Sequence, residues 1–506
     1  MKKYSYPAIS NSFRWIGLAA LLTLGPIDAA DFYAAPTGQS SNTGSISSPW
    51  DLPTALAGAG GRIHPGDSVW LRGGTYIPPN SNGYSSTVAG TVSAPIVIRN
   101  YQGERATLDG RGCEYVLAVN GAYSWFWGLE IMDSNPTRYI NQPGSSSPNA
   151  FGVAVFAPGV RFINNIVHDT AEGFSAYAVS NDSVFYGNLS YYNGWVGTDR
   201  NHGHGFYMQN ITGTKFLVDN FSSDNADEGF QIYGSGSANV VGFRLFGNAS
   251  FNNSSWPYEN YQYNYIIAGG AQRKDIQVDQ NFSFFTPSAN YGFNTFGQYT
   301  TGDDMTVTNN VFAGGAGGPE VNCQGGPIVF TGNKIYVQPG GLDEMRMELC
   351  PGQTTSGWTW DNNQYYGKTN FYNDTSMVDF VSWKLSRGFD AHSTMNTSAP
   401  TGKWIYVRPN QYESKRANIV IYNWDLSSAV PVDLSGVLAA GDPFVIHDTQ
   451  NFYGSPVASG TYTGAPISIP MTGLTKATPS GFAAPPHTAP LFGTFIVTSS
   501  NSTAGG

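Results

Sequence analysis

The sequence predicts an all-β protein in which a solenoid of stacked β-coils is followed by a small C-terminal β-sandwich-like domain. The 506 residues include 61 Gly, 30 Tyr and 30 Phe, and only 12% are charged. This composition suits short strands and tight turns more than helices. A repeated Asn motif in the central chain predicts the stacking, and the end of that repeat near residue 368 predicts a domain boundary.

The N-terminus has the features of an export signal. Basic residues precede an apolar run at residues 15–24, and Ala29 and Ala30 follow it. We expect residues 1–30 to be a signal peptide and the mature protein to be secreted or periplasmic. No later run approaches the roughly 20 apolar residues of a membrane span, so no membrane partner is expected after signal removal. The net charge of −10 disfavours nucleic acid and anionic membranes as partners.

The central repeat is an apolar strand, an Asn, and a further apolar residue, as in FINNI, FYGNL and LFGNA. Successive repeats lie 23 to 33 residues apart, which is typical of a solenoid with variable loops. We expect each Asn to lie at a coil corner, to tolerate a left-handed backbone and to hydrogen-bond to its equivalent one coil away. The repeated residues are Asn165, Asn188, Asn220, Asn248, Asn281, Asn310, Asn333 and Asn363.

The first coils resemble a known family. The segments DFYAAPTG, SPWDLPTAL and PGDSVWLRGGTY, the last at 65–76, resemble the opening of secreted right-handed β-helix proteins of the pectate-lyase-like superfamily. The resemblance covers about residues 31–367 and implies a right-handed parallel β-helix over 31–368 with a short N-terminal capping helix. That superfamily includes lyases, hydrolases, epimerases, esterases and non-catalytic tailspikes, so the fold alone does not identify the reaction.

The rest of the chain divides into three parts. We expect residues 369–399 to be a connector, 400–498 to be the β-sandwich-like domain and 499–506 to be a disordered tail. Cys323 and Cys350 end two similar strands and either form a disulfide or stay free, while Cys113 is expected to be a buried thiol.

Three coils align on their glycines as EGFSAY (172–177), HGFYMQ (204–209) and EGFQIY (228–233). Because side chains alternate along a strand, the Phe residues of these coils should point inward and a polar, aromatic face should point outward. A later coil, YGFNTF (291–296), extends this face. Such a face suits a polysaccharide or oligosaccharide, since rings stack on sugars and amides meet hydroxyls. The expected substrate-binding residues are Trp195, Tyr177, Gln209, Gln231, Tyr233 and Asn294.

The loop before the second of these coils, at 193–210, concentrates histidines with aromatic and charged residues. The alignment places His204 between Glu172 and Glu228, where titratable groups shift one another's pKa values. Histidine exchanges protons near neutral pH, so we interpret this region as the active site. The candidate catalytic residues are His204, Tyr207, Arg200, His202, Asp227, Glu228 and Glu172.

Two reactions remain open. In a β-elimination, a neutral His204 or a deprotonated Tyr207 removes the proton next to a uronate carboxylate, Arg200 offsets the developing charge and Tyr207 protonates the leaving oxygen. In a glycoside hydrolysis, paired carboxylates such as Asp227 and Glu228 flank the bond instead. The lyase is preferred because the His, Tyr and Arg cluster is a more specific sequence feature than carboxylates at coil corners. A non-catalytic glycan-binding or surface-attachment protein is the third alternative.

Neither reaction requires a cofactor by this reasoning. Zinc at His202, His204 and Asp199 would rest on a weak H-x-H pattern, so no metal ligand is assigned. Calcium on Asp224, Asp227 or Glu228 is an open alternative that would relieve the repulsion between these acids and a polyuronate.

Overall fold

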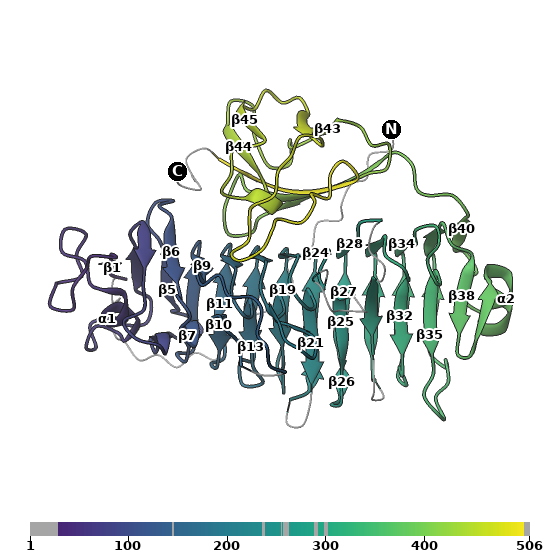
Figure 1. The fold of residues 1–506 in the computed structure, drawn as a ribbon, viewed down its shortest axis with the longest axis horizontal. Helices are drawn as coiled ribbons and strands as arrows, with labels where there is room; N and C mark the ends of the chain where they lie inside the picture. The colour runs from purple at the N-terminus through teal and green to yellow at the C-terminus, as the bar shows by residue number, and fades with distance from the viewer. Residues whose placement is uncertain are drawn as a thin grey trace.

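The computed structural model describes residues 29–143, 146–234, 238–254, 256, 263–287, 292–297 and 302–499. The signal peptide expected at 1–30 and the tail expected at 499–506 therefore lie almost entirely outside the described residues. Three 12-stranded sheets run the length of a parallel β-helix, and a separate C-terminal domain rests on its side (Figure 1). The expected all-β fold class is confirmed. No helix in the described part is long and apolar enough to cross a membrane.

Each coil from β2 to β38 contributes one strand to each sheet, in the order sheet 1, sheet 2, sheet 3. Sheet 1 consists of β1 (Asp31–Ala34), β2 (Ser68–Leu71), β5 (Ile96–Asn100), β8 (Ser124–Trp127), β11 (Arg161–Ile163), β14 (Val184–Tyr186), β19 (Lys215–Val218), β23 (Phe243–Phe246), β27 (Ile276–Asp279), β30 (Met305–Thr308), β33 (Ile328–Thr331) and β36 (Thr359–Asp361). Sheet 2 consists of β3 (Gly74–Tyr76), β6 (Ala106–Asp109), β9 (Glu130–Met132), β12 (Ile166–His168), β15 (Leu189–Tyr191), β20 (Phe221–Ser223), β24 (Ala249–Phe251), β28 (Phe282–Phe284), β31 (Val311–Ala313), β34 (Lys334–Tyr336), β37 (Gln364–Tyr366) and β40 (Thr394–Asn396).

Sheet 3 carries the candidate site. It consists of β4 (Gly83–Ser86), β7 (Tyr115–Val119), β10 (Phe151–Val155), β13 (Phe174–Ala176), β18 (Phe206–Met208), β21 (Phe230–Gly234), β25 (Tyr263–Gly269), β29 (Phe293–Phe296), β32 (Pro319–Asn322), β35 (Met345–Glu348), β38 (Asn370–Asn373) and β39 (Ser376–Asp379). Two short pairs lie outside the sheets, β16 (Trp195–Val196) with β17 (Asn201–His202) and β22 (Val240–Val241) with β26 (Arg273–Lys274). The N-terminal cap contains the short helix α1 (Leu52–Leu56).

Stacked aromatic rings fill the interior of the solenoid. Phe174, Phe206, Phe230 and Tyr265 form one stack, with ring centroids 4.9, 4.6 and 5.1 Å apart. Phe174 pairs in register with Phe206, which pairs with Phe230, so the alignment expected from the glycines is confirmed. Each ring buries its faces only against the coils above and below, which makes the stacking of coils the source of the core.

The Asn repeat forms a hydrogen-bonded ladder at the corner between sheets 1 and 2. The Nδ2 of Asn188 donates to the Oδ1 of Asn220 at 2.9 Å, and the Nδ2 of Asn220 donates to that of Asn248 at 2.9 Å. The same bond links all eight residues from Asn165 to Asn363. The expected side-chain bonding is confirmed.

The left-handed backbone lies one residue earlier than we expected. The residue before each ladder Asn has a positive φ, for example 67° at Gly187 and 55° at Asp219. This position makes the sharp turn, and it explains the Gly in FYGNL and LFGNA. The ladder Asn keeps an ordinary backbone because its amide has to reach along the solenoid axis.

A second ladder at the corner between sheets 2 and 3 was not predicted. The Nδ2 of Asn193 donates to Asn225 at 2.9 Å, and that of Asn225 donates to Asn253 at 2.8 Å. The Nδ2 of each Asn also donates to the hydroxyl of a serine three residues earlier, as Asn225 does to Ser222 at 3.1 Å. The S-x-x-N pattern of these turns is the sequence signal that the analysis missed.

Residues 369–399, expected as a connector, form the last coil of the solenoid. Strand β38 pairs in parallel with β35 and β40 with β37, and α2 (Phe380–Arg387) closes the end. The buried Asp390 accepts hydrogen bonds from Trp383 and Tyr365, so this acid anchors the closing helix to the final coil.

The C-terminal domain has its own core and a large apolar contact with the solenoid. Strands β41 (Lys403–Pro409), β42 (Ala417–Asn423), β47 (Phe492–Thr498), β44 (Pro443–Asp448) and β45 (Ala458–Thr461) form one antiparallel sheet; β43 (Ala429–Val432) and β46 (Ile467–Pro470) form a second, and η1 (Thr449–Asn451) follows β44. Phe492 and Tyr422 pack on sheet 2, where Phe492 stacks on Phe284 at 4.5 Å. The domain therefore covers sheet 2 and leaves the outer face of sheet 3 uncovered (Figure 1).

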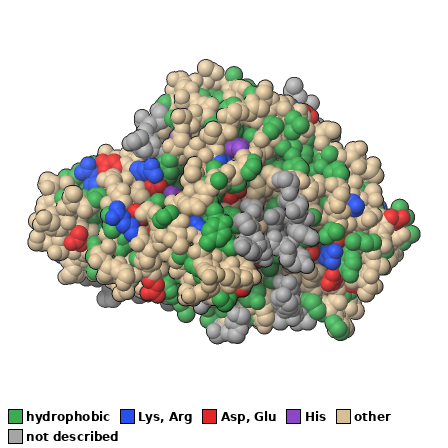
Figure 2. Space-filling view, viewed as in Figure 1, with side chains coloured by type: hydrophobic (Ala, Val, Ile, Leu, Met, Phe, Trp, Pro, Cys, Tyr) green, Lys and Arg blue, Asp and Glu red, His purple; other side chains and the backbone are tan. Residues whose placement is uncertain are grey.

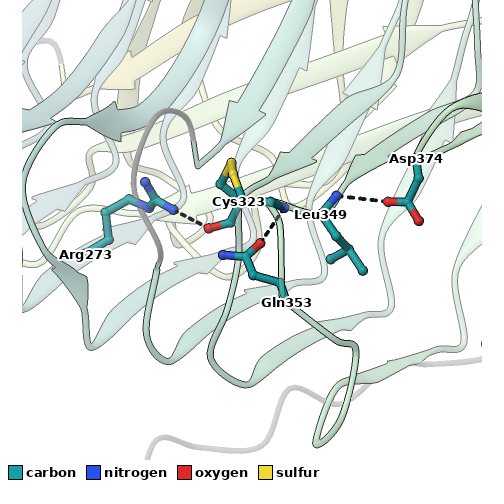
Figure 3. The surroundings of a disulfide bond; sticks show 6 residues. Arg273, Cys323, Leu349, Gln353 and Asp374 are labelled. Atoms are coloured by element: carbon teal, nitrogen blue, oxygen red, sulfur yellow. Dashed lines mark hydrogen bonds between the residues drawn. A yellow bond between two sulfur atoms is a disulfide. The ribbon is translucent and has the colours of Figure 1, made fainter.

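A disulfide joins Cys323 to Cys350, with Cα atoms 4.8 Å apart (Figure 3). The two cysteines follow β32 and β35 in adjacent coils. Arg273 donates to the Cys323 carbonyl at 3.0 Å, and Gln353 accepts from the Cys350 amide at 2.8 Å. Of the two possibilities that the sequence left open, the structure contains the bridge, and Cys113 is a buried free thiol as expected.

Candidate active site

The candidate residues gather where three successive coils turn from sheet 2 into sheet 3. Glu172 precedes β13, His204 precedes β18, and Asp227 and Glu228 precede β21. The strand register places Glu172, His204 and Glu228 at equivalent positions of three adjacent coils. Neighbouring parallel strands lie about 4.8 Å apart, so their side chains meet along the solenoid axis.

Glycines make this close approach possible. A Cβ on Gly173 would lie 2.3 Å from the hydroxyl of Ser190, and one on Gly205 would lie 2.1 Å from that of Ser222. These serines belong to the second Asn ladder, which therefore packs directly under the strand starts that hold the acidic residues. The E-G-F, H-G-F and E-G-F motifs thus need Gly for space, not for an unusual φ.

His204 lies between two carboxylates. Its Nδ1 is 2.9 Å from Glu172 Oε1, and its Nε2 is 2.9 Å from Glu228 Oε2. The contact with Glu172 is a hydrogen bond, whereas the contact with Glu228 is an ion pair without hydrogen-bond geometry. Burial alone would lower the pKa of His204, but the two carboxylates outweigh it and raise that pKa well above its usual value. This result counts against the neutral His204 expected as a base.

Asp227 and Arg200 form the second part of this centre. Asp227 Oδ2 lies 2.5 Å from Arg200 Nη1 and 3.7 Å from His204 Nε2. Burial and the adjacent Glu228 raise the pKa of Asp227, while His204 helps to hold that of Glu228 below its usual value. The Arg200 side chain is 52% exposed, so this guanidinium can contact a solvent-side ligand while it pairs with Asp227.

Aromatic residues flank the charged centre on the same column of sheet 3. Phe151 occupies the position equivalent to Glu172 one coil earlier, and Tyr115 pairs with Phe151. On the other side Tyr263 follows Glu228 in register and pairs with Phe293. The segment FGVAVF has the same x-G-apolar spacing as EGFSAY, but it lacks the polar residues that marked the other coils in the sequence.

The polar face expected on sheet 3 is partly formed. Tyr207 and Gln231 pair in register and point outward; the Tyr207 ring lies 5.5 Å from that of His204, and its hydroxyl accepts from Gln209 at 2.9 Å. Burial raises the pKa of Tyr207, which counts against the deprotonated form expected as a base. Tyr177 stacks on Phe156 at 5.0 Å, and Tyr233 is half-buried on β21.

Three expected site residues lie elsewhere. Trp195 and His202 face each other across the β16–β17 hairpin, with stacked rings 4.9 Å apart, and His202 also contacts Asp199 at 3.1 Å. Both rings pack against each other within the hairpin, so the His202 side chain does not lie beside that of His204. Asn294 pairs with the buried Tyr265, so it does not lie on the outward face. A bulge in β25 places Thr295, and not Asn294, in register with the outward-facing Gln231.

The C-terminal domain supports the back of the site. Lys476 Nζ lies 2.8 Å from both oxygens of Asp224, and both side chains are buried. Asp224, one of the carboxylates considered for calcium, is therefore used in an interdomain ion pair. Arg138, which is also buried, donates to the carbonyls of Ser480 and Gly194 and so ties this domain to the hairpin.

His204, Asp227 and Glu228 have the chemistry of a cation site. Their ligand atoms lie within 4.8 Å of one another, and they are the one such group found among the described residues. The Nε2 of His204 and the Oε2 of Glu228 are buried without hydrogen-bond partners. The two carboxylates fit calcium, which prefers oxygen, whereas an imidazole nitrogen is a more usual ligand for transition metals.

Sequence comparisons match the first half of the solenoid to a known family. Residues 32–272 match the family model described as the Pel9A-like right-handed β-helix region. The expected resemblance to the pectate-lyase-like superfamily and the right-handed parallel β-helix are thereby confirmed.

Individual relatives match shorter segments. Pectate lyase PEL9 of Emericella nidulans is 38% identical over 82 residues, 16% of this chain and 19% of that protein. Pectate lyase L of Dickeya dadantii is 31% identical over 121 residues, 22% of this chain and 28% of that protein. The chain thus spans less than a third of the length of these relatives.

Among solved structures, pectate lyase Pel9A is 18% identical and has a TM-score of 0.41, with 74% of this chain and 78% of that chain covered. A rhamnogalacturonan lyase is 14% identical with a TM-score of 0.45, covering 73% and 87%.

Proposed function

We propose that the protein is a polysaccharide lyase that cleaves a uronate-containing polysaccharide by β-elimination outside the cytoplasm. The observation that carries this proposal is the column on sheet 3, in which a charged centre at Glu172, His204 and Glu228 is flanked by aromatic residues in both directions. Such a column suits a sugar chain that lies along the solenoid axis, with rings at its flanks and charged groups at the reacting residue. The matches to pectate lyases support the same reaction class.

The chain's own groups account for two of the roles in a β-elimination. The exposed guanidinium of Arg200 binds the uronate carboxylate and offsets the charge that develops when the adjacent proton leaves. Tyr207 keeps its proton because burial raises its pKa, which suits donation to the leaving oxygen as the C–O bond breaks. The raised pKa of His204 leaves the base unassigned.

A divalent cation would be held by Asp227 and Glu228, with His204 at its side. When bound, it would neutralise these carboxylates and attract a uronate carboxylate, which the acidic centre otherwise repels. Calcium is the ion that the two carboxylates favour.

Hydrolysis by paired carboxylates has less support. Asp227 and Glu228 are adjacent in sequence and precede the same strand, whereas the two carboxyl groups of a glycosidase stand on either side of the bond. Glu172 and Glu228 are farther apart, but the His204 ring fills the space between them that a sugar and a water would need. A disulfide within the described chain favours an oxidising compartment and so supports the extracellular or periplasmic location.

The test is to incubate the purified protein with uronate-containing and neutral polysaccharides, with and without calcium. Ultraviolet absorbance of the unsaturated product and new reducing ends are followed together. We expect both signals to rise on a uronate polymer and both to fall at least about a hundredfold in Tyr207→Phe, in line with the loss of a proton-transfer group. His204→Gln should also lower both signals, because it removes the charged group between Glu172 and Glu228. His392→Gln, which changes an exposed histidine in the last coil, is the matched control and should keep full activity.

Each alternative outcome is distinct. Reducing ends without absorbance would mean hydrolysis and would refute the lyase. Glycan binding without any turnover would favour the non-catalytic attachment protein.

A further inference from the structure

A cavity of about 530 Å³ lies between the first coils and the C-terminal domain, away from the turns that carry the candidate active site. The coils contribute residues 99–106 and 128–130, and the C-terminal domain contributes residues 412–416 and Tyr453. Figure 2 shows Lys, Arg, Asp and Glu side chains gathered on the N-terminal coils beside the junction with this domain. The volume is in the range of sites that take a small ligand or a short sugar.

The carboxylates that line this cavity are already paired. Glu104 binds Arg72 through two hydrogen bonds, at 2.9 and 3.0 Å. Glu130 binds Arg105 at 2.5 and 2.7 Å, and Glu413 accepts from the indole of Trp127 at 2.5 Å. Glu413 also pairs with Arg416 at 3.2 Å. Each of these acids therefore has a basic partner, which weakens its repulsion of an anionic ligand.

Arg99 is different, because it has no ion pair among the described residues. Its guanidinium lies between two indole rings, 5.1 Å from the centroid of Trp70 and 4.1 Å from that of Trp127. Its Nε is buried and makes no hydrogen bond, and the same holds for the Nε of Arg416 on the opposite wall. Arg99 therefore lines the cavity without an acidic partner, a situation that costs free energy unless a ligand supplies an acceptor, whereas Arg416 already pairs with Glu413 at 3.2 Å.

Aromatic surface completes the cavity. The Arg105 guanidinium lies 3.6 Å from the centroid of Tyr453, and the Tyr412 ring packs against Trp127 at 5.7 Å. Ring faces and edges beside guanidinium donors are the combination that binds sugars carrying a carboxylate, since the rings contact C–H faces and the guanidinium pairs with the carboxylate.

We propose that this cavity is a second, non-catalytic binding site for a short carboxylate-bearing oligosaccharide, with Arg99 as its anion-binding group. The inference goes beyond the proposed lyase activity and does not depend on it. A uronate carboxylate accepts from the guanidinium of Arg99, and the sugar rings lie against Tyr412 and Tyr453. The site holds a product or a chain end while sheet 3 remains free.

The experiment measures binding of a uronate trisaccharide to the full-length protein by calorimetry and locates it by hydrogen–deuterium exchange. We expect protection in residues 96–106 and 410–418, weaker binding at higher salt, and at least about a tenfold loss of affinity in Arg99→Gln, as for a charge-assisted hydrogen bond. The matched control is Arg62→Gln. Arg62 also lies over a tryptophan, Trp50, at 4.6 Å, but it does not line the cavity.

Three results would overturn the inference. They are equal affinity in Arg99→Gln and wild type, equal binding of a neutral trisaccharide, and protection confined to the sheet 3 face. The last result would leave the lyase proposal intact, whereas protection of the cavity in a protein without lyase turnover would refute the lyase alone. Equal loss in both variants would show that the loss of a stacked arginine, not of a contact with the anion, weakens binding, and would also overturn the inference.

Discussion

Asn225→Ala should weaken the second Asn ladder and damage the candidate site together. The side chain makes four buried hydrogen bonds of 3.1 Å or less: it donates to Asn253 at 2.8 Å and to Ser222 at 3.1 Å, and it accepts from the amide and the Nδ2 of Asn193 at 3.1 and 2.9 Å. A longer fifth bond runs to the Ser190 carbonyl at 3.4 Å. At about 1 kcal/mol for each bond, the loss is about 4 kcal/mol. Because Asn225 lies two residues before Asp227, we also expect lyase activity to fall at least about tenfold at temperatures where the variant is folded.

Asn220→Ala is the matched control for this prediction. Asn220 lies in the same coil at the other corner and also makes four bonds, each 2.9 Å long, to Asn188, Asn248 and Phe185. Its loss should cost a similar free energy of local opening but leave activity nearly unchanged. Hydrogen exchange of the backbone amides of the neighbouring coils measures that free energy, and the lyase assay measures the second effect. An opening free energy equal to wild type in Asn225→Ala, or equal loss of activity in both variants, would refute the reasoning.

Three further predictions concern stability. Lys476→Met should lower the free energy of unfolding by about 3 to 5 kcal/mol, because it leaves Asp224 as a buried unpaired carboxylate, and urea unfolding measures this loss; a change below about 1 kcal/mol would contradict it. Burial raises the pKa of Glu320 from 4.5 to about 7. Its protonated form therefore contributes about 3 kcal/mol to the free energy of unfolding below pH 4.5, and this contribution is lost as the pH rises through 7. Glu320→Gln should flatten the dependence of the free energy of unfolding on pH in this range, and an unchanged slope would refute the prediction. Replacing Cys323 and Cys350, 27 residues apart, by serine should cost about 3 kcal/mol of stability in thermal unfolding, and reductant should then have no further effect.

The features that repeat along the chain were predictable. A Phe at the same place after Gly in three coils predicted the register of β13, β18 and β21, because each coil has to present the same inward positions to its neighbours. The neighbourhood of Glu172, His204 and Glu228 followed from that register. Periodicity carries this information because one coil differs from the next by a simple translation.

The features that depend on local turns or distant contacts were not predictable. The β16–β17 hairpin stacks His202 on Trp195 and so separates it from His204, although the two histidines are two residues apart in sequence. Lys476 reaches Asp224 from 252 residues away, and no periodic signal marks such a pair. The direction of the pKa shift of His204 likewise depends on two carboxylates at hydrogen-bond distance, which register alone does not give.

The contacts between the two domains make the C-terminal domain part of the site's support. Arg138 is fully buried, and its guanidinium bonds Asp169 at 3.0 Å, the Ser480 carbonyl at 3.0 Å and the Gly194 carbonyl at 3.2 Å. One group therefore joins the turn before β13, the C-terminal domain and the hairpin that carries Arg200. Without that domain, Arg138 and Asp224 would each lose a buried partner, and the free-energy cost would fall on the turns that hold Glu172 and Asp227. The domain that covers sheet 2 thus stabilises the turns that lead from sheet 2 into sheet 3 and hold the candidate active-site residues.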